Sequence, residues 1–245
     1  MSITAGLRRY EEVNEDIKNA LLSKNKAIVR EVNGQRYIGC AMDAGKTIEV
    51  HGTPGNDMAC YLNGGTVEVF GNCQDAVGNT MGGGKIIVHG HTGDALGYGM
   101  RDGEIYIRDN VCCRGGIHMK EFRQMKPVLV IGQSAGSFLG EYMAGGTVVL
   151  LGLHMKRGEK LFGTHCASGM HGGKIFVRGN FPKENLSENI KVKSLNEEDA
   201  AELKRYVKNY CKYFGEDYDA VMQKPFKKLV PVSSRPYANL YTSNS

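Results

Sequence analysis

Seven short segments that alternate apolar with polar residues recur along the middle of the chain. They are GKTIEVHG, GGTVEVFG, GGKIIVHG, DGEIYIRD, KPVLVIG, GGTVVLLG and GGKIFVRG, ending at residues 52, 71, 90, 109, 132, 152 and 179, with spacings of 19, 19, 19, 23, 20 and 27. Alternation with a period of two predicts β-strands that turn one side chain inward and the next outward. A repeat of about 19 residues therefore organises this part of the sequence.

Equivalent positions of the repeats form apolar columns. The strands give two inner columns, one of Ile48, Val67, Ile86, Ile105, Val128, Val148 and Ile175 and one of Val50, Val69, Val88, Ile107, Val130, Leu150 and Val177. The connections give two more, one of Met58, Val77, Leu96, Leu139 and Phe162 and one of Leu62, Met81, Met100, Met119, Met143 and Met170. Units stacked at the strand spacing of about 4.8 Å would bury these columns as ladders. The pattern predicts an all-β fold, a single-stranded parallel β-helix of about seven coils.

Both ends of such a β-helix expose strand edges and apolar interior, so we expect a helical cap at each end. One face at helical spacing near the start of the chain carries Val13, Ile17, Ala20, Leu21 and Leu22. SLNEEDAAELKRYVKNYCKYFG predicts a second helix, and KPFKKLVPVSSRPYANLYTSNS after it is expected to run extended over the surface. The predicted segments are a helical leader over residues 1–33, the β-helix over 34–180, and a C-terminal helix and tail over 181–245.

The outer face of the predicted strands changes character along the chain. Its early positions are polar or charged (Glu49, His51, Glu68 and His89), whereas its positions in the last three strands are Leu129, Ile131, Val149, Leu151 and Phe176. A soluble protein rarely exposes so large an apolar patch. A partner protein could cover it, but we favour the C-terminal helix, which carries Ala200, Leu203, Val207 and Tyr210 on one face.

Glycine is the outlier in composition, with 33 residues, but the strict alternation argues against a flexible glycine-rich linker. The hexapeptide period of left-handed β-helices is absent, and Asp57, Asp75 and Asp94 are too far apart for calcium-binding nonapeptides. No ten-residue helical pattern follows the glycines, which argues against a dinucleotide-binding unit.

Charge and cysteine content restrict partners and location. The net charge of +5 comes from scattered lysines and arginines, so nucleic acid is not an expected partner. No apolar run approaches the roughly 18 residues that cross a bilayer, and the first residues do not resemble a signal peptide. Seven cysteines without such a signal indicate free thiols in a reducing compartment, which predicts a cytoplasmic protein.

Candidate chemistry is sparse. The two longest connections hold Cys112, Cys113, His118, His154, His165, Cys166 and His171, which could bind zinc or form a Cys/His dyad. Their spacing matches no common metal motif, and Cys112 stands where neighbouring repeats carry Gly93 and Gly136, so packing of a small residue is the favoured interpretation. Glu49 and Glu68 on adjacent coils could mimic a polysaccharide-cleaving site, but solvated ladder positions are favoured. We therefore expect no catalytic residue and no metal or cofactor site in this chain.

Two coils are longer than the 19-residue repeat, through NVCCRGGIHMKEFRQMK and LHMKRGEKLFGTHCASGMH. Insertions on one side of a solenoid commonly form its binding face, although a plain surface loop is the alternative. The candidate partner or channel face consists of His118, Lys120, Glu121, Arg123, His154, Lys156 and Arg157.

GGTVVLLG preceded by GEYMA, the units GTPGNDM and GHTGDAL, and NGQRYIG near the start together resemble the GXGXG domain of the glutamate synthase large subunit, over roughly residues 30 to 180. The resemblance implies a right-handed parallel β-helix without catalytic residues. In that family it packs between a class II glutaminase domain and an FMN and iron–sulfur synthase domain and helps form the ammonia route. A separate chain resembles the split form of archaea and some bacteria.

We therefore expect a non-catalytic structural and ammonia-channel subunit of glutamate synthase, which converts glutamine, 2-oxoglutarate and reductant to two glutamates. FMN and iron–sulfur clusters would belong to the partner subunits, and a homo-oligomer is possible. A related repeat in the β-helical component of formylmethanofuran dehydrogenase implies the same fold with another function. An independent polysaccharide-acting β-helical enzyme is the third alternative.

Overall fold

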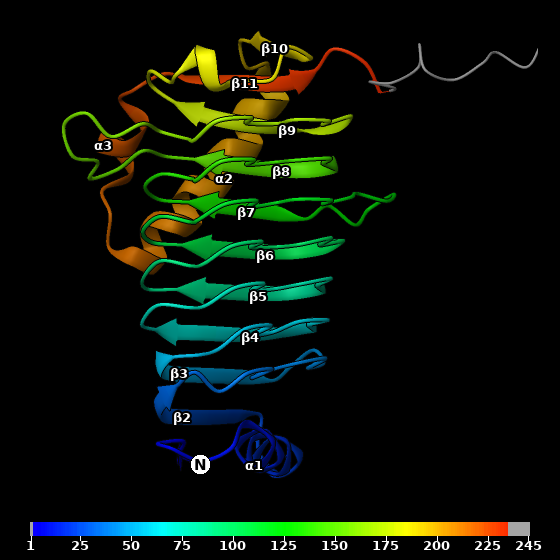
Figure 1. Ribbon diagram of the computed structural model, residues 1–245, viewed down its shortest axis with the longest axis vertical. Helices are drawn as coiled ribbons and strands as arrows, with labels where there is room; N and C mark the ends of the chain where they lie inside the picture. Colours follow the sequence, from blue (N-terminus) through cyan, green and yellow to red (C-terminus); the bar gives the residue numbers. More distant parts are fainter. Residues whose placement is uncertain (1, 235–245) are drawn as a thin grey trace, which may run out of the picture.

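The computed structural model describes residues 2–234 and shows one eleven-stranded sheet in the order β1-β2-β3-β4-β5-β6-β7-β8-β9-β11-β10 (Figure 1). The strands are β1 (Ser2–Thr4), β2 (Lys26–Asn33), β3 (Thr47–Thr53), β4 (Asn63–Phe70), β5 (Gly82–Val88), β6 (Asp102–Ile107), β7 (Val128–Ile131), β8 (Ala144–Leu150), β9 (Gly172–Arg178), β10 (Ile190–Lys193) and β11 (Phe226–Pro231). Strands β1 to β9 pair in parallel, so the predicted parallel β-solenoid is confirmed. The predicted strands are β3 to β9, and about six turns separate the first from the last rather than the seven coils expected.

Like residues lie over like through the interior. Ile48, Val67, Ile86 and Ile105 occupy matched register positions in β3 to β6, and none of them is exposed. The methionine column is also continuous, because each member's carbonyl accepts a hydrogen bond from the residue that follows its counterpart in the next coil, as Met81 O does from Arg101 N at 2.8 Å. Leu62, Met81, Met100, Met119, Met143 and Met170 are all fully buried.

Each coil turns a corner through three left-handed residues at alternate positions, such as 76, 78 and 80. The outer two donate their N–H groups to the next coil, from Ala76 to Asp94 O (2.8 Å) and from Thr80 to Tyr98 O (2.7 Å). The middle one, Gly78, donates to Met58 O of the preceding coil at 2.9 Å. A Cβ on Gly78 would lie 2.6 Å from Ile105 Cδ1, so this position faces the packed interior. Glycine or alanine recurs at this middle position because every coil repeats the corner.

The orientation predicted for β7 is wrong by one residue. Leu129 pairs with Ile105 on one side and Val148 on the other, which places it in the interior ladder, and Ile131 follows in the same way. Val128 and Val130 therefore face outward. A shift of one residue exchanges the two faces of a strand, and the uninterrupted apolar run VLVI gives no alternation that would fix its orientation.

One interior position in the connections also differs from the prediction. Ala167 N donates to Leu139 O at 2.7 Å, so Cys166, not Phe162, lies next to Leu139 in that column. Phe162 forms an isolated parallel bridge with Ala135 in a neighbouring column, and it is fully buried there.

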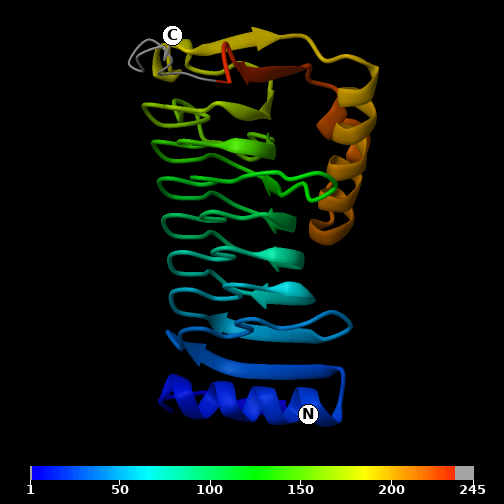
Figure 2. The same ribbon diagram turned by 90° about the vertical axis from the view of Figure 1, so that its right-hand side faces the viewer.

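Helix α2 (Glu197–Phe214) lies along the outer face of the sheet (Figure 2). It packs Leu203, Val207 and Tyr210 onto the outward residues Tyr106, Val128, Val130, Val149, Leu151 and Phe176. The expectation that this helix covers the apolar outer patch is confirmed, with Val128 and Val130 in place of Leu129 and Ile131. It does not cap the end of the solenoid.

The last coil is instead followed by more sheet. Strand β11 pairs antiparallel with both β9 and β10, so this part of the tail is a strand of the sheet and does not run over the surface as predicted. The short helices η1 (Lys183–Asn185) and α3 (Tyr218–Met222) connect these elements. Residues 235–245 of the predicted tail lie outside the described residues.

At the other end, helix α1 (Tyr10–Ser23) lies across the first strands (Figure 2). Its buried residues Val13, Ile17, Ala20 and Leu21 join the interior cluster. Leu22, which was expected on the same face, is instead 73% exposed. Among residues 2–234, no helix is long and apolar enough to cross a membrane.

Candidate functional site

The cysteines and histidines of the long connections do not converge. Cys112 is exposed, and Cys166 is buried in an interior ladder, where burial raises the pKa of its thiol. His165 stacks on Phe138, with ring centroids 4.9 Å apart. Within the described part of the chain, no group of three or more His, Cys, Asp or Glu side chains is placed to hold a metal ion.

Glu49 and Glu68 are neighbours on adjacent coils, as predicted. Lys26 and His51 each lie 2.7 Å from a carboxylate oxygen of Glu49, and His89 lies 2.9 Å from Glu68. Hydrogen bonds from Lys26 and His51 hold the pKa of Glu49 below its ordinary value. A glycosidase of the usual type needs one carboxyl group with a raised pKa as its acid, and the shift of Glu49 is in the opposite direction. The contacts of both carboxylates with basic side chains are those of a ladder of ion pairs.

The two insertions protrude on opposite sides of the solenoid (Figure 1). The first lies before β7, on the side where the strands begin, and carries His118, Lys120, Glu121 and Arg123. The second lies after β8, beside α3, and carries His154, Lys156 and Arg157. His154 Nε2 is 2.7 Å from an oxygen of Glu216, which follows α2. The structure therefore divides the predicted residues between two surfaces.

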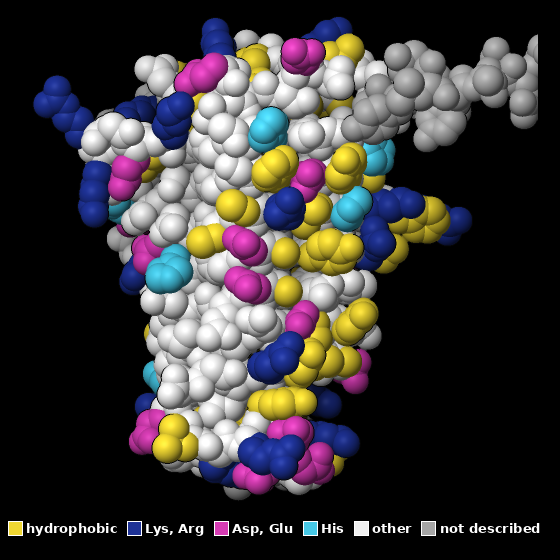
Figure 3. Space-filling view, viewed as in Figure 1, with side chains coloured by type: hydrophobic (Ala, Val, Ile, Leu, Met, Phe, Trp, Pro, Cys, Tyr) yellow, Lys and Arg dark blue, Asp and Glu magenta, His cyan; other side chains and the backbone are white. Residues whose placement is uncertain are grey.

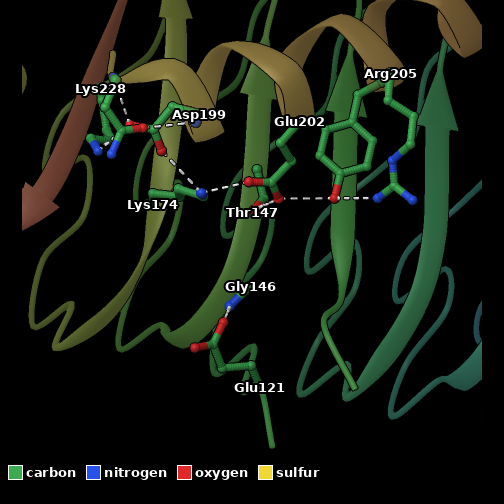
Figure 4. Close-up of polar contacts among 10 residues, drawn as sticks. Glu121, Gly146, Thr147, Lys174, Asp199, Glu202, Arg205 and Lys228 are labelled. Carbon is green, nitrogen blue, oxygen red and sulfur yellow. Dashed lines mark hydrogen bonds and ion pairs between the residues drawn. The ribbon is translucent and has the colours of Figure 1, made fainter. Parts of the chain in front are cut away.

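Within the first insertion, Glu121 and the hairpin tip have different roles. Glu121 Oε2 accepts a hydrogen bond from Gly146 N at 2.9 Å, which ties the loop to the next coil (Figure 4). Phe122 and Met125 form an isolated antiparallel bridge at the tip and remain 55% and 39% exposed. The Arg123 guanidinium lies 5.0 Å from the centre of the Phe122 ring. The tip therefore presents apolar side chains beside a cation.

Beside this tip lies a shallow hollow of about 690 Å³, which we call the corner face. Its lining residues include Tyr98, Arg101, His118, Lys120, Tyr142 and His171. The His118 ring is stacked on Tyr142 with centroids 5.3 Å apart and meets Tyr98 edge-on at 5.8 Å. Hydrophobic side chains gather on the half of the surface where the strands begin, mixed with histidines and with basic and acidic side chains (Figure 3). The corner face thus combines aromatic rings with basic groups.

A second hollow, of about 820 Å³, lies between α2 and the starts of the strands, and Glu202 and Tyr206 in its lining belong to a network of charged residues beside it. Asp199 binds Lys228 and Lys174, Lys174 Nζ also lies 2.5 Å from Glu202, and Tyr206 donates to Glu202 at 3.0 Å (Figure 4). Burial alone would raise the pKa values of Asp199 and Glu202, but hydrogen bonds from these lysines outweigh it and both lie below their ordinary values. This network attaches α2 to the sheet.

Sequence reasoning missed the aromatic part of the corner face. Tyr98 and Tyr142 stand beside corner glycines in GYG and GEYM, and the third left-handed position of the corner recurs as His118 and Tyr142 in consecutive coils. Aligning the repeats from this position would have brought the rings together, since equivalent residues of adjacent coils are neighbours.

A family model for the GXGXG motif matches residues 4–234. The uncharacterized protein MJ1350 of Methanocaldococcus jannaschii is 40% identical over 242 residues, which cover 95% of this chain and 93% of that protein. The family match extends over β2 to β11 and so includes strands and helices outside the glycine-rich repeat. The chain belongs to the GXGXG motif family.

Proposed function

We propose that this protein is a non-catalytic structural subunit of a cytoplasmic glutamate synthase complex and forms part of the wall of its ammonia route. Membership of the GXGXG motif family over residues 4–234 carries this proposal. The domain of that name in glutamate synthase packs between a glutaminase and a synthase domain. In the complex, a class II glutaminase subunit would release ammonia, and a subunit with FMN and iron–sulfur clusters would reduce the adduct with 2-oxoglutarate.

The solenoid suits the part of a rigid wall. Its backbone N–H and C=O groups are used in hydrogen bonds from coil to coil, as between Gly97 N and Val77 O at 2.8 Å. A wall of this kind keeps a fixed shape, and its paired backbone groups do not protonate ammonia as it passes. Transfer between two active sites needs exclusion of water and fixed geometry, which a stack of interlocked coils can provide.

The corner face is the surface that we assign to a partner subunit. Protein interfaces are enriched in tyrosine, phenylalanine, methionine and arginine, and the corner face with its hairpin tip exposes all four. Tyr98 is 42% exposed and Phe122 55%. Lys120 and Arg101 add positive charge, so the facing surface is expected to be acidic.

Reconstitution tests this proposal. The chain is co-expressed with the glutaminase and FMN/iron–sulfur synthase proteins of the same genome, and glutamine-dependent glutamate formation is measured with and without it. We expect the three proteins to co-purify and the reaction to need this chain. Equal activity in its absence would contradict the proposal. Co-purification with formylmethanofuran dehydrogenase subunits would assign the chain to that complex instead.

Two matched charge reversals locate the interface. Lys120→Glu changes the corner face, whereas Lys156→Glu changes the second insertion on the other side of the solenoid. Because the facing surface is expected to be acidic, we expect K120E to weaken binding about 10-fold or more and K156E to leave it unchanged. The reverse order of effects in a binding titration would move the interface to the second insertion.

A further inference from the structure

Two cysteines occupy matched places in the first two coils. Ala41 N donates a hydrogen bond to Cys60 O at 2.9 Å, so Cys40 and Cys60 lie one above the other at the corner that leads into β3 and β4. Neighbouring coils of a parallel stack place matched Cα atoms about 4.8 Å apart. Disulfide bonds span Cα separations of about 4.4–6.8 Å, so the backbone already has the spacing that a disulfide needs.

The two thiols also contact each other and differ in access. Burial, together with a hydrogen bond between its side chain and that of Cys40, raises the pKa of Cys60 to about 12. Cys60 is only 3% exposed, whereas Cys40 is exposed and lines a hollow of about 430 Å³ between α1 and the first coil. A reagent from solution therefore reaches Cys40 first, and Cys60 stands directly behind it.

We propose that Cys40 and Cys60 form a reversible dithiol–disulfide pair that responds to low-molecular-weight disulfides. The Cys40 thiolate attacks one sulfur of the disulfide, which releases one small thiolate and leaves a mixed disulfide on Cys40. Cys60 then loses its proton to the released thiolate and attacks Cys40 Sγ, which expels the second small thiolate. Two protein thiols are oxidised, and one small disulfide is reduced to two thiols.

Cys73, Cys112 and Cys166 lack this arrangement. Cys73 and Cys166 are buried in the interior cluster, where an oxidant cannot reach them. Cys112 is exposed like Cys40, but its matched positions in the adjacent coils are Gly93 and Gly136, which carry no thiol. Cys112 is therefore the natural control for an exposed cysteine without a partner above or below it.

The bond would close a loop of about 20 residues and join the first two coils, over which α1 lies. A covalent link of this size restricts the unfolded chain, so oxidation should stabilise this end of the solenoid. This inference rests on the thiol pair alone and does not depend on the proposed complex.

Incubation of the reduced full-length protein with glutathione disulfide tests the proposal. Intact mass and peptide mapping should show loss of two hydrogens and a Cys40–Cys60 linkage, reversed by dithiothreitol, with a higher melting temperature in the oxidised form. Cys60→Ala, which keeps the buried position apolar, should stop at one glutathione on Cys40. Cys112→Ser should form the internal bond at the wild-type rate.

Mapping of the wild-type protein needs no variant and decides the matter even if Cys60→Ala folds poorly. Three outcomes would each contradict the proposed Cys40–Cys60 pair. They are a linkage between Cys112 and Cys113, disulfides between chains only, and a stable glutathione adduct on Cys40 of the wild type.

Discussion

At the scale of single residues, the corner of each coil sets the strictest demand on the sequence. Its middle left-handed position points into the core and is filled only by the two smallest side chains, in the order Gly39, Ala59, Gly78, Gly97, Gly116, Gly140 and Ala167. The third position of the corner points outward and also accepts tyrosine, threonine or histidine. Space inside the solenoid, more than the dihedral angle, therefore decides which residue fits.

Replacing Gly78 or Gly99 by alanine separates these two causes. Both glycines have positive φ, which costs alanine about 1–2 kcal/mol. Gly78 has Ile105 Cδ1 at 2.6 Å from the new Cβ, whereas the nearest atom at Gly99 is Thr80 Oγ1 at 3.8 Å. Urea denaturation should show Gly78→Ala to be less stable than Gly99→Ala by about another 1–3 kcal/mol. Equal losses of stability in the two variants would mean that the side chains around Gly78 move to accommodate the new Cβ without an energetic cost.

The repeat period indicates which residues of β7 face the interior. Counted from strand end to strand end, the spacings around β7 are 23 and 20, but counted from Ile105 to Leu129 and on to Val148 they are 24 and 19. The second count restores the regular period. The alternation of apolar and polar residues could not reveal the orientation of β7. Helix α2 covers its outer face, so both faces are buried and apolar, and no polar residue marks which side faces outward.

At the scale of elements, α2 is defined by its ends and by its length. Asn196 and Asp199 form a capping box at its start, and Gly215 ends it in the left-handed conformation. Its 18 residues extend about 27 Å, close to the five spacings of about 4.8 Å that separate β5 from β11. Accordingly Asp199 meets Lys228 of β11 at one end, and Phe214 meets His89 beside β5 at the other.

Removing the charge of Asp199 should destabilise the protein in a pH-dependent way. The depressed pKa of Asp199 means that its stabilising contribution is present above the unfolded value of about 3.9 and is lost as pH falls through the folded value. Asp199→Asn should lower the free energy of unfolding by about 1–3 kcal/mol at pH 7. Denaturant titrations should show this difference shrink below about pH 4, and a constant difference down to pH 2 would contradict the assignment.

A charge under α2 should detach it from the sheet. Val207 is fully buried against the outer face, so Val207→Asp would bury a carboxylate without a partner. We expect an apolar dye to bind the uncovered strands while the circular dichroism of the sheet remains. Lys204→Asp adds the same side chain at an exposed position of α2 and should bind no dye. Dye binding by both variants would show that the response is not specific to the covered face.

The helices could be predicted because their signals are local, but β10 and β11 could not. Strand β11 joins the sheet between β9 and β10, and it reaches this place only after α2 and α3 have run along the outer wall. Its sequence FKKLVP carries two exposed or half-buried lysines and buries only Leu229. Long-range packing decides this pairing, so the six residues of β11 alone do not predict it.

At the scale of the whole molecule, stability should vary along the stack. Each coil contacts mainly its neighbours, so coils at the ends are held from one side and central coils from both. Helix α2 further covers β6 to β9. Hydrogen exchange measured by mass spectrometry should therefore be slowest in β6 to β8 and fastest in β1 to β3. Uniform exchange along the sheet would indicate that the solenoid opens as one unit.

The candidate site was predictable only in part for a geometric reason. Longer coils indicate where loops protrude, but the side on which they protrude depends on where in the turn the extra residues enter. The first insertion follows Met119 and precedes a strand, whereas the second follows Leu151 at the end of a strand. Two insertions in nearby coils thus emerge on opposite surfaces, and only the path of the chain reveals it.

The extent of α2 along the stack also determines how the molecule can change length in evolution. Gain or loss of one repeat moves the two ends of the solenoid by about 4.8 Å. Between β5 and β11 such a change would leave α2 too long or too short for the strands it covers, whereas β3 and β4 lie beyond its reach. Homologues with a different number of repeats should therefore have gained or lost them near β3 and β4, at the end of the solenoid that α2 does not cover.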